Sequence, residues 1–306
     1  PVSGHPAPLA LDPGQNYLYV GCRDEFGISS FVIDQHTGQL SKIGVIELDS
    51  DPCYLATDRT GRFLLSAYYN AGKIAIHSIN VDGVVDKRPV QSFTTNTGAH
   101  SIQTDLSNRF AFVPHIADRG PNVILQFKFD EVNGTLTPNQ PYTLTAHANA
   151  GPRHYCFHPT KNIAYFSNEQ GSSVTAYKID TFSGTLSPFQ TVSTLPAGYQ
   201  GSNTCAQIQI VPTGRFLYAP NRGHNTIAGF SVNESTGELT PIGHTVTEPI
   251  PRAFCLDPSG RFLYAAGLQT GRLKAYSIDE NSGELSPFQT HPVGLTPMWV
   301  LFAARD

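Results

Sequence analysis

Charge is scarce in this chain, and the charge that is present has no basic excess. Asp, Glu, Lys and Arg make up 14% of the 306 residues, against roughly 25% in an average globular protein. The net charge is −4 at pH 7, so no electrostatic footprint for a phosphate backbone is present and we expect no nucleic-acid partner. No apolar run approaches the roughly 20 residues of a membrane-spanning helix, so we expect no membrane partner either.

Cysteine is limited to five residues with no Cys-x-x-Cys pair. A zinc site therefore has no support, and we expect neither a metal nor a cofactor. Cys156 and Cys255 hold the same position in two repeats, three residues before Pro159 and Pro258. Because equivalent positions of different repeats do not face each other, we expect free thiols that pack as small hydrophobic side chains.

One turn recurs six times along the chain. Each copy has a glycine after a small or polar residue, and five copies have a leucine two residues beyond it. The glycines are Gly38, Gly83, Gly134, Gly184, Gly237 and Gly283, and they recur every 45 to 53 residues. A period in this range is typical of solenoids, propellers and arrays.

Each repeat holds enough sequence for four strands. A corner such as residues 257–260 (Asp-Pro-Ser-Gly) precedes an aromatic-rich apolar run, and an alternating stretch such as 174–179 follows a polar loop. Alternation with period 2 indicates half-buried strands, and four-stranded units repeated around an axis make a β-propeller. We therefore predict an all-β protein in which residues 1–306 form a single β-propeller domain.

The C-terminal segment supplies one strand more than six blades need. Residues 297–302 (Pro-Met-Trp-Val-Leu-Phe) match the inner strand of a further blade. Its three companions would have to precede Pro1, and an unpaired sheet edge of this kind favours aggregation. The sequence thus predicts six complete blades plus the inner strand of a seventh, with the N-terminal strands that complete it absent from this chain.

Candidate functional residues fall at two positions of the repeat, the start of the inner strand and the end of the second strand. Counting back from the corners aligns His100, Arg153 and Arg252, with His154 beside them and Gln207 in the fifth blade. The ends of the second strands carry Arg23, Asn70, Asn168, Glu169, Asn221 and Arg222. Both positions lie on one face of a propeller, so we expect a funnel suited to a small, multiply anionic ligand that guanidinium groups clamp bidentately.

Structural interpretations apply to each of these residues taken alone. An arginine in a propeller loop is often a salt-bridged surface residue, and a histidine at a strand start is often a structural side chain. Their shared position in the repeat is what favours a functional cluster. The aspartates of the corners, Asp12, Asp58, Asp105 and Asp257, lie on the opposite face, where capping of Asx turns explains them.

Several motifs resemble the propeller-type 6-phosphogluconolactonases of bacteria. They are Gly-Ala-His-Ser at 98–101, Gly-Pro-Arg-His at 151–154, Asn-Glu at 168–169, Asn-Arg-Gly at 221–223, Pro-Arg at 251–252 and Pro-Met-Trp-Val at 297–300. The resemblance covers essentially the whole chain and implies a seven-bladed lactonase-type propeller. The carboxymuconate-lactonizing enzymes of the broader family look similar at the same positions.

The resemblance also implies roles for individual residues. The family's active-site histidine falls on His100, its arginines on Arg153 and Arg222, and its acid on Glu169, with Arg252 at a further basic position. These positions imply metal-independent hydrolysis of 6-phosphoglucono-δ-lactone to 6-phosphogluconate, in the pentose phosphate pathway and in the cytoplasm.

In that reaction Glu169 or His100 would activate the water, and Arg153 would stabilise the oxyanion. Arg222 and Arg252 would hold the phosphate. Gln207 departs from the family, in which an acidic residue is frequent early in the fifth blade, and the departure bears on activity if that acid assists catalysis.

Two other functions remain open. A cycloisomerase that closes a muconate-type diacid would use the same cations and the same acid and base. A non-catalytic binding propeller would instead present an apolar, aromatic funnel, and the charged positions count against it. The sequence does not indicate an oligomeric state.

Overall fold

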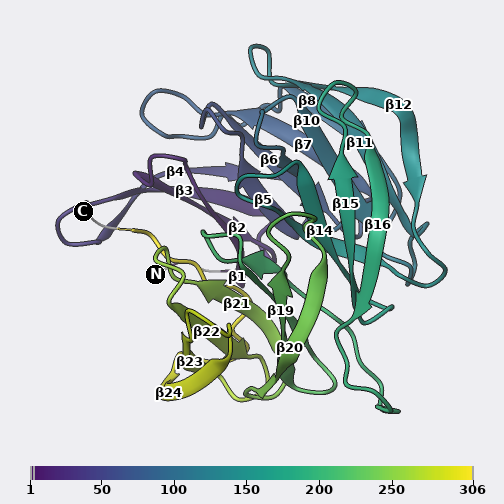
Figure 1. Ribbon diagram of the computed structural model, residues 1–306. Coiled ribbons are helices and arrows are strands. Elements are labelled where there is room, and N and C mark those ends of the chain that lie inside the picture. The colour runs from purple at the N-terminus through teal and green to yellow at the C-terminus, as the bar shows by residue number, and fades with distance from the viewer. Residues whose placement is uncertain (1, 3, 305–306) are drawn as a thin grey trace. The chain divides into compact units, whose positions relative to one another are not determined.

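The computed structural model describes residues 2 and 4–304, and every regular element in that part of the chain is a β-strand. The 24 strands form six four-stranded sheets, each antiparallel and each following chain order (Figure 1). The six four-stranded repeats predicted from the turn spacing are therefore confirmed.

The first three sheets contain β1 (Pro6–Leu11), β2 (Tyr17–Cys22), β3 (Gly27–Ile33) and β4 (Leu40–Glu47), then β5 (Tyr54–Thr57), β6 (Phe63–Tyr68), β7 (Lys73–Ser78) and β8 (Gln91–Thr94), then β9 (Gln103–Thr104), β10 (Phe110–His115), β11 (Val123–Asp130) and β12 (Thr135–Thr145). The last three contain β13 (Pro152–Phe157), β14 (Ile163–Asn168), β15 (Ser173–Ile179) and β16 (Leu186–Ser193), then β17 (Gln209–Ile210), β18 (Phe216–Asn221), β19 (Thr226–Val232) and β20 (Leu239–Val246), then β21 (Pro251–Leu256), β22 (Phe262–Gly267), β23 (Arg272–Ile278) and β24 (Leu285–Pro292).

The chain forms two compact units of three sheets each. The N-terminal unit runs to Thr145 and takes in the residues from Ala303 onward, and the C-terminal unit covers Ala146–Phe302. Within each unit the second strand of every sheet is almost entirely buried. The apolar runs that follow the corners in the sequence therefore form the cores between neighbouring sheets.

The corner aspartates cap turns, as the sequence predicted. The Asp58 carboxylate accepts hydrogen bonds from the backbone N–H groups of Arg62 (2.9 Å) and Phe63 (3.0 Å). Asp105 does the same for Arg109 and Phe110, both at 2.9 Å. Each aspartate thus satisfies the donors exposed where the chain reverses into the second strand.

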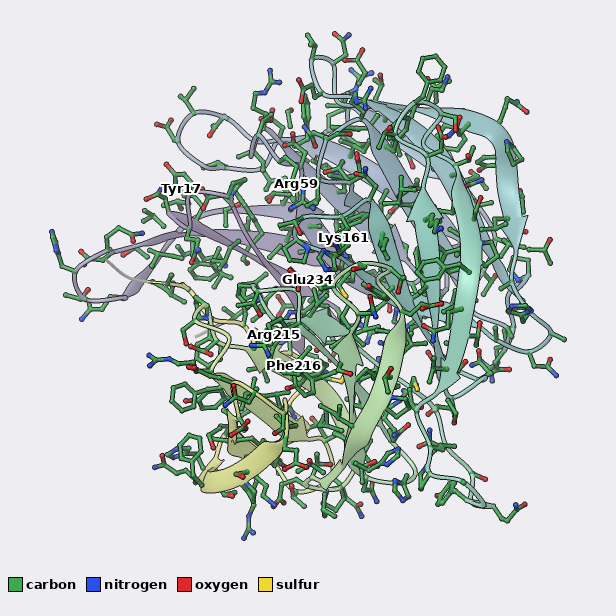
Figure 2. The ribbon with its side chains drawn as sticks, viewed as in Figure 1. Tyr17, Arg59, Lys161, Arg215, Phe216 and Glu234 are labelled. Carbon is green, nitrogen blue, oxygen red and sulfur yellow. The ribbon has the colours of Figure 1, made fainter. Side chains whose placement is uncertain are left out.

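The recurring turn glycines join neighbouring sheets. Gly237 and Gly283 have φ values of +76° and +73°, and a Cβ at either would overlap a side chain of the preceding sheet, Ile163 or the Phe216 ring. The carbonyl oxygens of the same glycines accept hydrogen bonds from buried tyrosines, Tyr165 Oη at 2.8 Å and Tyr218 Oη at 2.7 Å. Figure 2 labels Phe216 and its neighbour Arg215, whose guanidinium lies 5.3 Å from the Phe216 ring centre.

Glutamine side chains make a second link between neighbouring sheets. The Gln190 carboxamide donates to the Leu239 carbonyl (2.9 Å) and accepts from the Leu239 N–H (2.7 Å). Gln91 binds the Leu136 backbone in the same way, at 3.1 and 2.6 Å. In both cases the leucine is the one that ends the recurring turn, so the turn is held by packing on one side and by an amide on the other.

The C-terminal segment 297–302, predicted as an inner strand, is not a strand in the structure. A strand requires a hydrogen-bonding partner, and no described residue supplies a ladder for this segment. Phe302 instead packs edge-on against Tyr264, with ring centres 4.9 Å apart.

All five cysteines are free thiols. Burial raises the pKa of Cys205 to about 11, so this thiol is protonated at neutral pH. Within the described part of the chain, no helix is long and apolar enough to cross a membrane.

Replacing Gly237 by alanine tests the joint between sheets. We expect the positive φ to cost about 1–2 kcal/mol and the overlap with Ile163 to cost about 1–3 kcal/mol more. Gly198→Ala is the matched control, because Gly198 has φ +80° but nothing lies within 4 Å of its added Cβ. Urea unfolding of both variants measures the difference, and equal losses of stability would show that the turn does not depend on this contact.

Candidate active site

A β-bulge opens the inner strand in the fourth and sixth sheets. Pro152 pairs with Asn168 and His154 pairs with Ser167, so Arg153 is an extra residue with no partner in the ladder. Pro251 pairs with Gly267 and Ala253 with Ala266, which leaves Arg252 as the extra residue. Bulges re-aim side chains and recur beside active sites, and here each one carries an arginine.

The ladder confirms the predicted equivalence of His100, Arg153 and Arg252. His100 follows the bridge between Ala99 and His115, just as the two arginines follow Pro152 and Pro251. The fifth sheet has its bridge at Cys205 and Asn221, so its equivalent residue is Ala206.

Gln207, predicted to bind substrate, makes a hydrogen bond between two sheets. Gln207 lies one residue past Ala206, and its carboxamide oxygen accepts the Phe254 N–H at 2.9 Å. Only 6% of the residue is exposed. Gln207 therefore links the fifth and sixth sheets.

Backbone hydrogen bonds fix the residues that follow the second strands. The Glu169 N–H donates to the Gly151 carbonyl (2.6 Å), and the Arg222 N–H donates to the Thr204 carbonyl (2.9 Å). The two bonds occupy equivalent positions, one within the fourth sheet and one within the fifth. Glu169 and Arg222 are thereby held beside the bulged ends of the inner strands.

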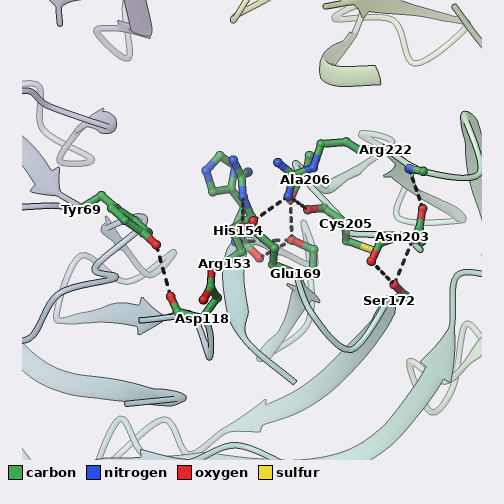
Figure 3. Close-up of polar contacts among 12 residues, drawn as sticks. Tyr69, Asp118, Arg153, His154, Glu169, Ser172, Asn203, Cys205, Ala206 and Arg222 are labelled. Atoms are coloured by element: carbon green, nitrogen blue, oxygen red, sulfur yellow. Dashed lines mark hydrogen bonds and ion pairs between the residues drawn. The ribbon is translucent and has the colours of Figure 1, made fainter. Parts of the chain in front are cut away.

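Glu169 forms ion pairs with two arginines, one through each oxygen (Figure 3). Oε2 lies 2.7 Å from Arg153 Nε, and Oε1 lies 2.7 Å from Arg222 Nη2. The side chains are 14% (Glu169), 2% (Arg153) and 13% (Arg222) exposed. Arg222 Nη2 also donates to the Cys205 carbonyl at 2.7 Å, so its guanidinium is fixed from two directions.

The charges of this cluster do not cancel. Burial alone would raise the pKa of Glu169, but Arg153 and Arg222, with a contribution from Arg252, outweigh it and hold that pKa below 4.5. Three guanidinium groups thus act on one carboxylate that is ionised at neutral pH. The excess positive charge, shielded from water, suits an anionic ligand.

His154 lies in the same cluster. Its burial, together with the charges of Arg153, Arg252 and Arg222, holds the pKa of the imidazole well below 6.5, so the ring is neutral at pH 7. The ring centre is 6.0 Å from that of Trp299, which brings the 297–300 motif beside the arginines.

The asparagines predicted to bind substrate are buried and hydrogen-bonded within the protein. Asn168 is 1% exposed, and its amide donates to Ser173 Oγ (2.9 Å) and Thr175 Oγ1 (2.8 Å). Asn221 is fully buried, and it donates to the Thr194 carbonyl and accepts from Thr194 Oγ1. Asn168 thus bonds within its own sheet, and Asn221 bonds Thr194, the residue that follows β16 of the fourth sheet.

Three predicted residues belong to the N-terminal unit. His100 is 6% exposed and its ring packs edge-on against Tyr69, with ring centres 5.7 Å apart. Arg23 pairs with Asp51 at 2.9 Å, and Asn70 is exposed in the turn after β6.

Two residues that support the cluster were not predicted. Ser167 Oγ donates to the Ala206 carbonyl at 2.8 Å and so ties the fourth sheet to the fifth beside the bulge. Asn203 donates to Asn221 Oδ1 and accepts the Gly223 N–H, both at 2.9 Å. Asn203 stands in a polar loop with no repeat equivalent to align it, so only its tendency to cap turns was available as a signal. Among the residues the structure describes, no group of three or more His, Cys, Asp or Glu side chains could hold a metal ion.

Glu169→Gln tests the ion pairs through pH. Because the folded pKa of Glu169 lies below 4.5, its stabilising effect is complete above the pKa of an unfolded glutamate and is lost as pH falls through the lower folded value. We expect the variant to be about 3 kcal/mol less stable at pH 7, since it removes the carboxylate that pairs with two largely buried arginines. The difference in stability between the variant and the parent, measured by thermal unfolding, should become smaller toward pH 3.

The control for this experiment is Glu234→Gln, which removes an exposed carboxylate and should cost almost nothing at any pH. If the loss of stability caused by Glu169→Gln stays the same from pH 7 to pH 3, the conclusion that Glu169 is ionised in the folded protein is contradicted.

Comparison with known proteins agrees with this arrangement. The family model described as "Lactonase, 7-bladed beta-propeller" matches residues 2–302. The 6-phosphogluconolactonase of Pectobacterium carotovorum is 38% identical over 305 residues, which cover 100% of this chain and 90% of the relative. The 6-phosphogluconolactonase of Yersinia pestis is 38% identical over 300 residues, with 98% and 88% covered.

Solved structures give the same result. The periplasmic gluconolactonase PpgL of Pseudomonas aeruginosa has a TM-score of 0.86 and 25% identity, over 94% of this chain and 85% of that one. A putative 6-phosphogluconolactonase of Bacteroides fragilis has a TM-score of 0.85 and 25% identity, over 97% and 86%. A family model that matches almost the whole length, together with these relatives, shows that the chain belongs to the lactonase family of seven-bladed β-propellers.

Proposed function

We propose that this chain hydrolyses 6-phosphoglucono-δ-lactone to 6-phosphogluconate. The observation that carries the proposal is the buried cluster in which Arg153 and Arg222 clamp Glu169 while the charge of Arg252 reaches the same carboxylate. Relatives that match the full chain at 36–38% identity bear the name 6-phosphogluconolactonase. A phosphorylated lactone is the kind of anion that an excess of guanidinium charge attracts.

The exposed fractions of the three arginines suggest a different role for each of them. Arg153 is 2% exposed and is engaged by Glu169, so we assign it to holding the carboxylate, in place of the oxyanion role expected from the sequence. Arg222 is 13% exposed and Arg252 is partly exposed, and these two are the arginines that a ligand reaches. We assign them to the phosphate and to the oxyanion that forms on the lactone carbonyl.

Glu169 is a poor general base in this arrangement. Both of its oxygens lie 2.7 Å from guanidinium nitrogens, and a carboxylate with a lowered pKa accepts a proton less readily at neutral pH. We therefore assign Glu169 to positioning the arginines and His100 to activating the water, since a neutral imidazole nitrogen can accept a proton.

The reaction consumes one water and gives a single product, the open-chain acid. The water oxygen bonds to the lactone carbonyl carbon while the base takes its proton, and negative charge develops on the carbonyl oxygen. Collapse of this intermediate breaks the bond to the ring oxygen, which leaves as a hydroxyl group after taking up a proton. Fixed guanidinium groups favour this path because they need no reorganisation when the charge appears.

We further propose that residues 1–306 act as a single domain and that the enzyme works in the cytoplasm. Five free thiols are compatible with a reducing compartment. The name of one structural neighbour places that protein in the periplasm, so fractionation of the native host is the direct test.

Arg252→Gln tests ligand binding without removing a member of the Glu169 ion pairs. We expect the variant to fold normally and to lose about 10- to 100-fold in kcat/KM on 6-phosphoglucono-δ-lactone, with a much smaller loss on unphosphorylated glucono-δ-lactone. Hydrolysis above the spontaneous background is measured for both substrates, with Arg261→Gln, an exposed corner arginine, as control. A folded parent that accelerates neither lactone sinks the proposal, and turnover of a muconate-type diacid in the same panel would favour the cycloisomerase.

His100→Asn tests the identity of the base. Loss of a general base lowers kcat by about 10²- to 10⁴-fold and removes the fall in rate toward acid pH that a titrating imidazole produces. The pH profile of kcat/KM for the parent and the variant measures both effects. An unchanged profile with an unchanged rate would exclude His100 and return the role to another group.

A further inference from the structure

A cavity of about 190 Å³ lies between the outer strands of the fifth and sixth sheets. Its lining includes Gly229, Gly243 and His244 from the fifth sheet and Gly283 and Leu285 from the sixth. This volume is far above the roughly 10–15 Å³ that a single water needs. The cavity belongs to the fourth strands β20 and β24, whereas the arginine cluster belongs to the heads of the inner strands and the ends of the second strands.

The cavity occupies the place where a glutamine stands in two other sheets. Gln190 pairs with Ala176 across β15 and β16, directly before a bulge, and Gly243 pairs with Gly229 at the same point of β19 and β20. Gln91 holds the matching place opposite Ile76. Gly243 is thus the position at which the linking carboxamide is missing.

The backbone groups that such a carboxamide would bind are present. Leu285 is equivalent to Leu239 and Leu136, whose N–H and C=O bind Gln190 and Gln91. The Asp279 N–H bonds to the Glu284 carbonyl, so the next pair, Ile278 and Leu285, is a non-hydrogen-bonded one and the Leu285 N–H and C=O point away from β23. Among the described residues, no side chain bonds either group.

We propose that this cavity binds small molecules that carry a primary carboxamide. Such a group offers an N–H donor and a C=O acceptor in a single plane. The Gln190 side chain uses these two functions to bind the backbone C=O and N–H of Leu239. The backbone pair of Leu285 requires both functions at once. A carboxylate has no N–H group to donate to the Leu285 carbonyl. It would also be repelled by the Glu284 carboxylate at the cavity wall.

The rest of the wall suits a short uncharged ligand. Tyr218 donates its hydroxyl to the Gly283 carbonyl (2.7 Å) and leaves its ring as an apolar surface. His244 Nε2 lies 2.9 Å from the Thr194 carbonyl oxygen, so this nitrogen has a partner within the protein. A Cβ at Gly243 would meet nothing within 4 Å, which shows that the space beside it is open.

Propionamide is the direct probe. We expect saturable binding in the millimolar range by chemical-shift perturbation or ligand-observed NMR, and at least tenfold weaker binding of propionate and of N,N-dimethylpropionamide, which lack the N–H donor. Equal binding of all three, or no saturable binding of propionamide, would overturn the proposal.

Two variants locate the site. Gly243→Gln should supply the missing carboxamide from the chain itself and abolish propionamide binding. Gly243→Ala is the matched control, because it introduces the same backbone strain at φ +149° without filling the cavity. It should bind the probe like the parent. Both variants should hydrolyse lactone at the parent rate, and a Gly243→Gln protein that still binds propionamide would show that the probe binds elsewhere.

Discussion

The contact between each turn glycine and the sheet before it is the constraint on which the packing of neighbouring sheets depends. At Gly237 and Gly283 no side chain fits between the turn and its neighbour, and a buried tyrosine hydroxyl bonds the glycine carbonyl. The contact fixes how far one sheet is displaced along the next. The glutamine link between Gln190 and Leu239 requires that displacement to be correct, because it joins a side chain of one sheet to a backbone N–H and C=O of the next.

The candidate site is a consequence of this alignment. Arg153 comes from a bulge in the fourth sheet, Glu169 from the end of its second strand, and Arg222 from the equivalent end in the fifth sheet. Ion pairs of 2.7 Å across two sheets require both ends to be held at the correct height, and the backbone bonds of Glu169 to Gly151 and of Arg222 to Thr204 do so. The arginine excess is tolerated because the cluster is preorganised by the fold and not by the ligand.

Much of this could be predicted from the sequence, because it follows from spacing. The turn glycines mark all six repeats and corner aspartates mark four of them, so counting back from the corners aligned His100, Arg153 and Arg252 correctly. Side-chain direction could not be predicted in the same way. Asn168 and Asn221 stand beside the charged residues in sequence, yet their buried amides bond Ser173 and Thr194, because a strand sends adjacent side chains to opposite faces.

Gln207 lies one residue past the position equivalent to Arg153 and Arg252, which Ala206 occupies, and an alanine gives no chemical signal. The glutamine links at Gln91 and Gln190 were missed for a related reason. A glutamine in an outer strand has no distinctive spacing in the sequence. Its role depends on the backbone N–H and C=O that the next sheet places beside it, and only the structure shows these groups.

The bulge residue has one further property. In the fourth and sixth sheets it is an arginine, set outside the regular register by the bulge, while His100 and Ala206 follow the equivalent bridges of the third and fifth sheets, so the position accepts different side chains. Chemistry at this position is therefore separable from the hydrogen bonding that stabilises the sheet. A lineage can exchange these side chains one at a time and explore new substrates while keeping the same scaffold, which makes the bulge a point of evolvability in an otherwise rigid repeat.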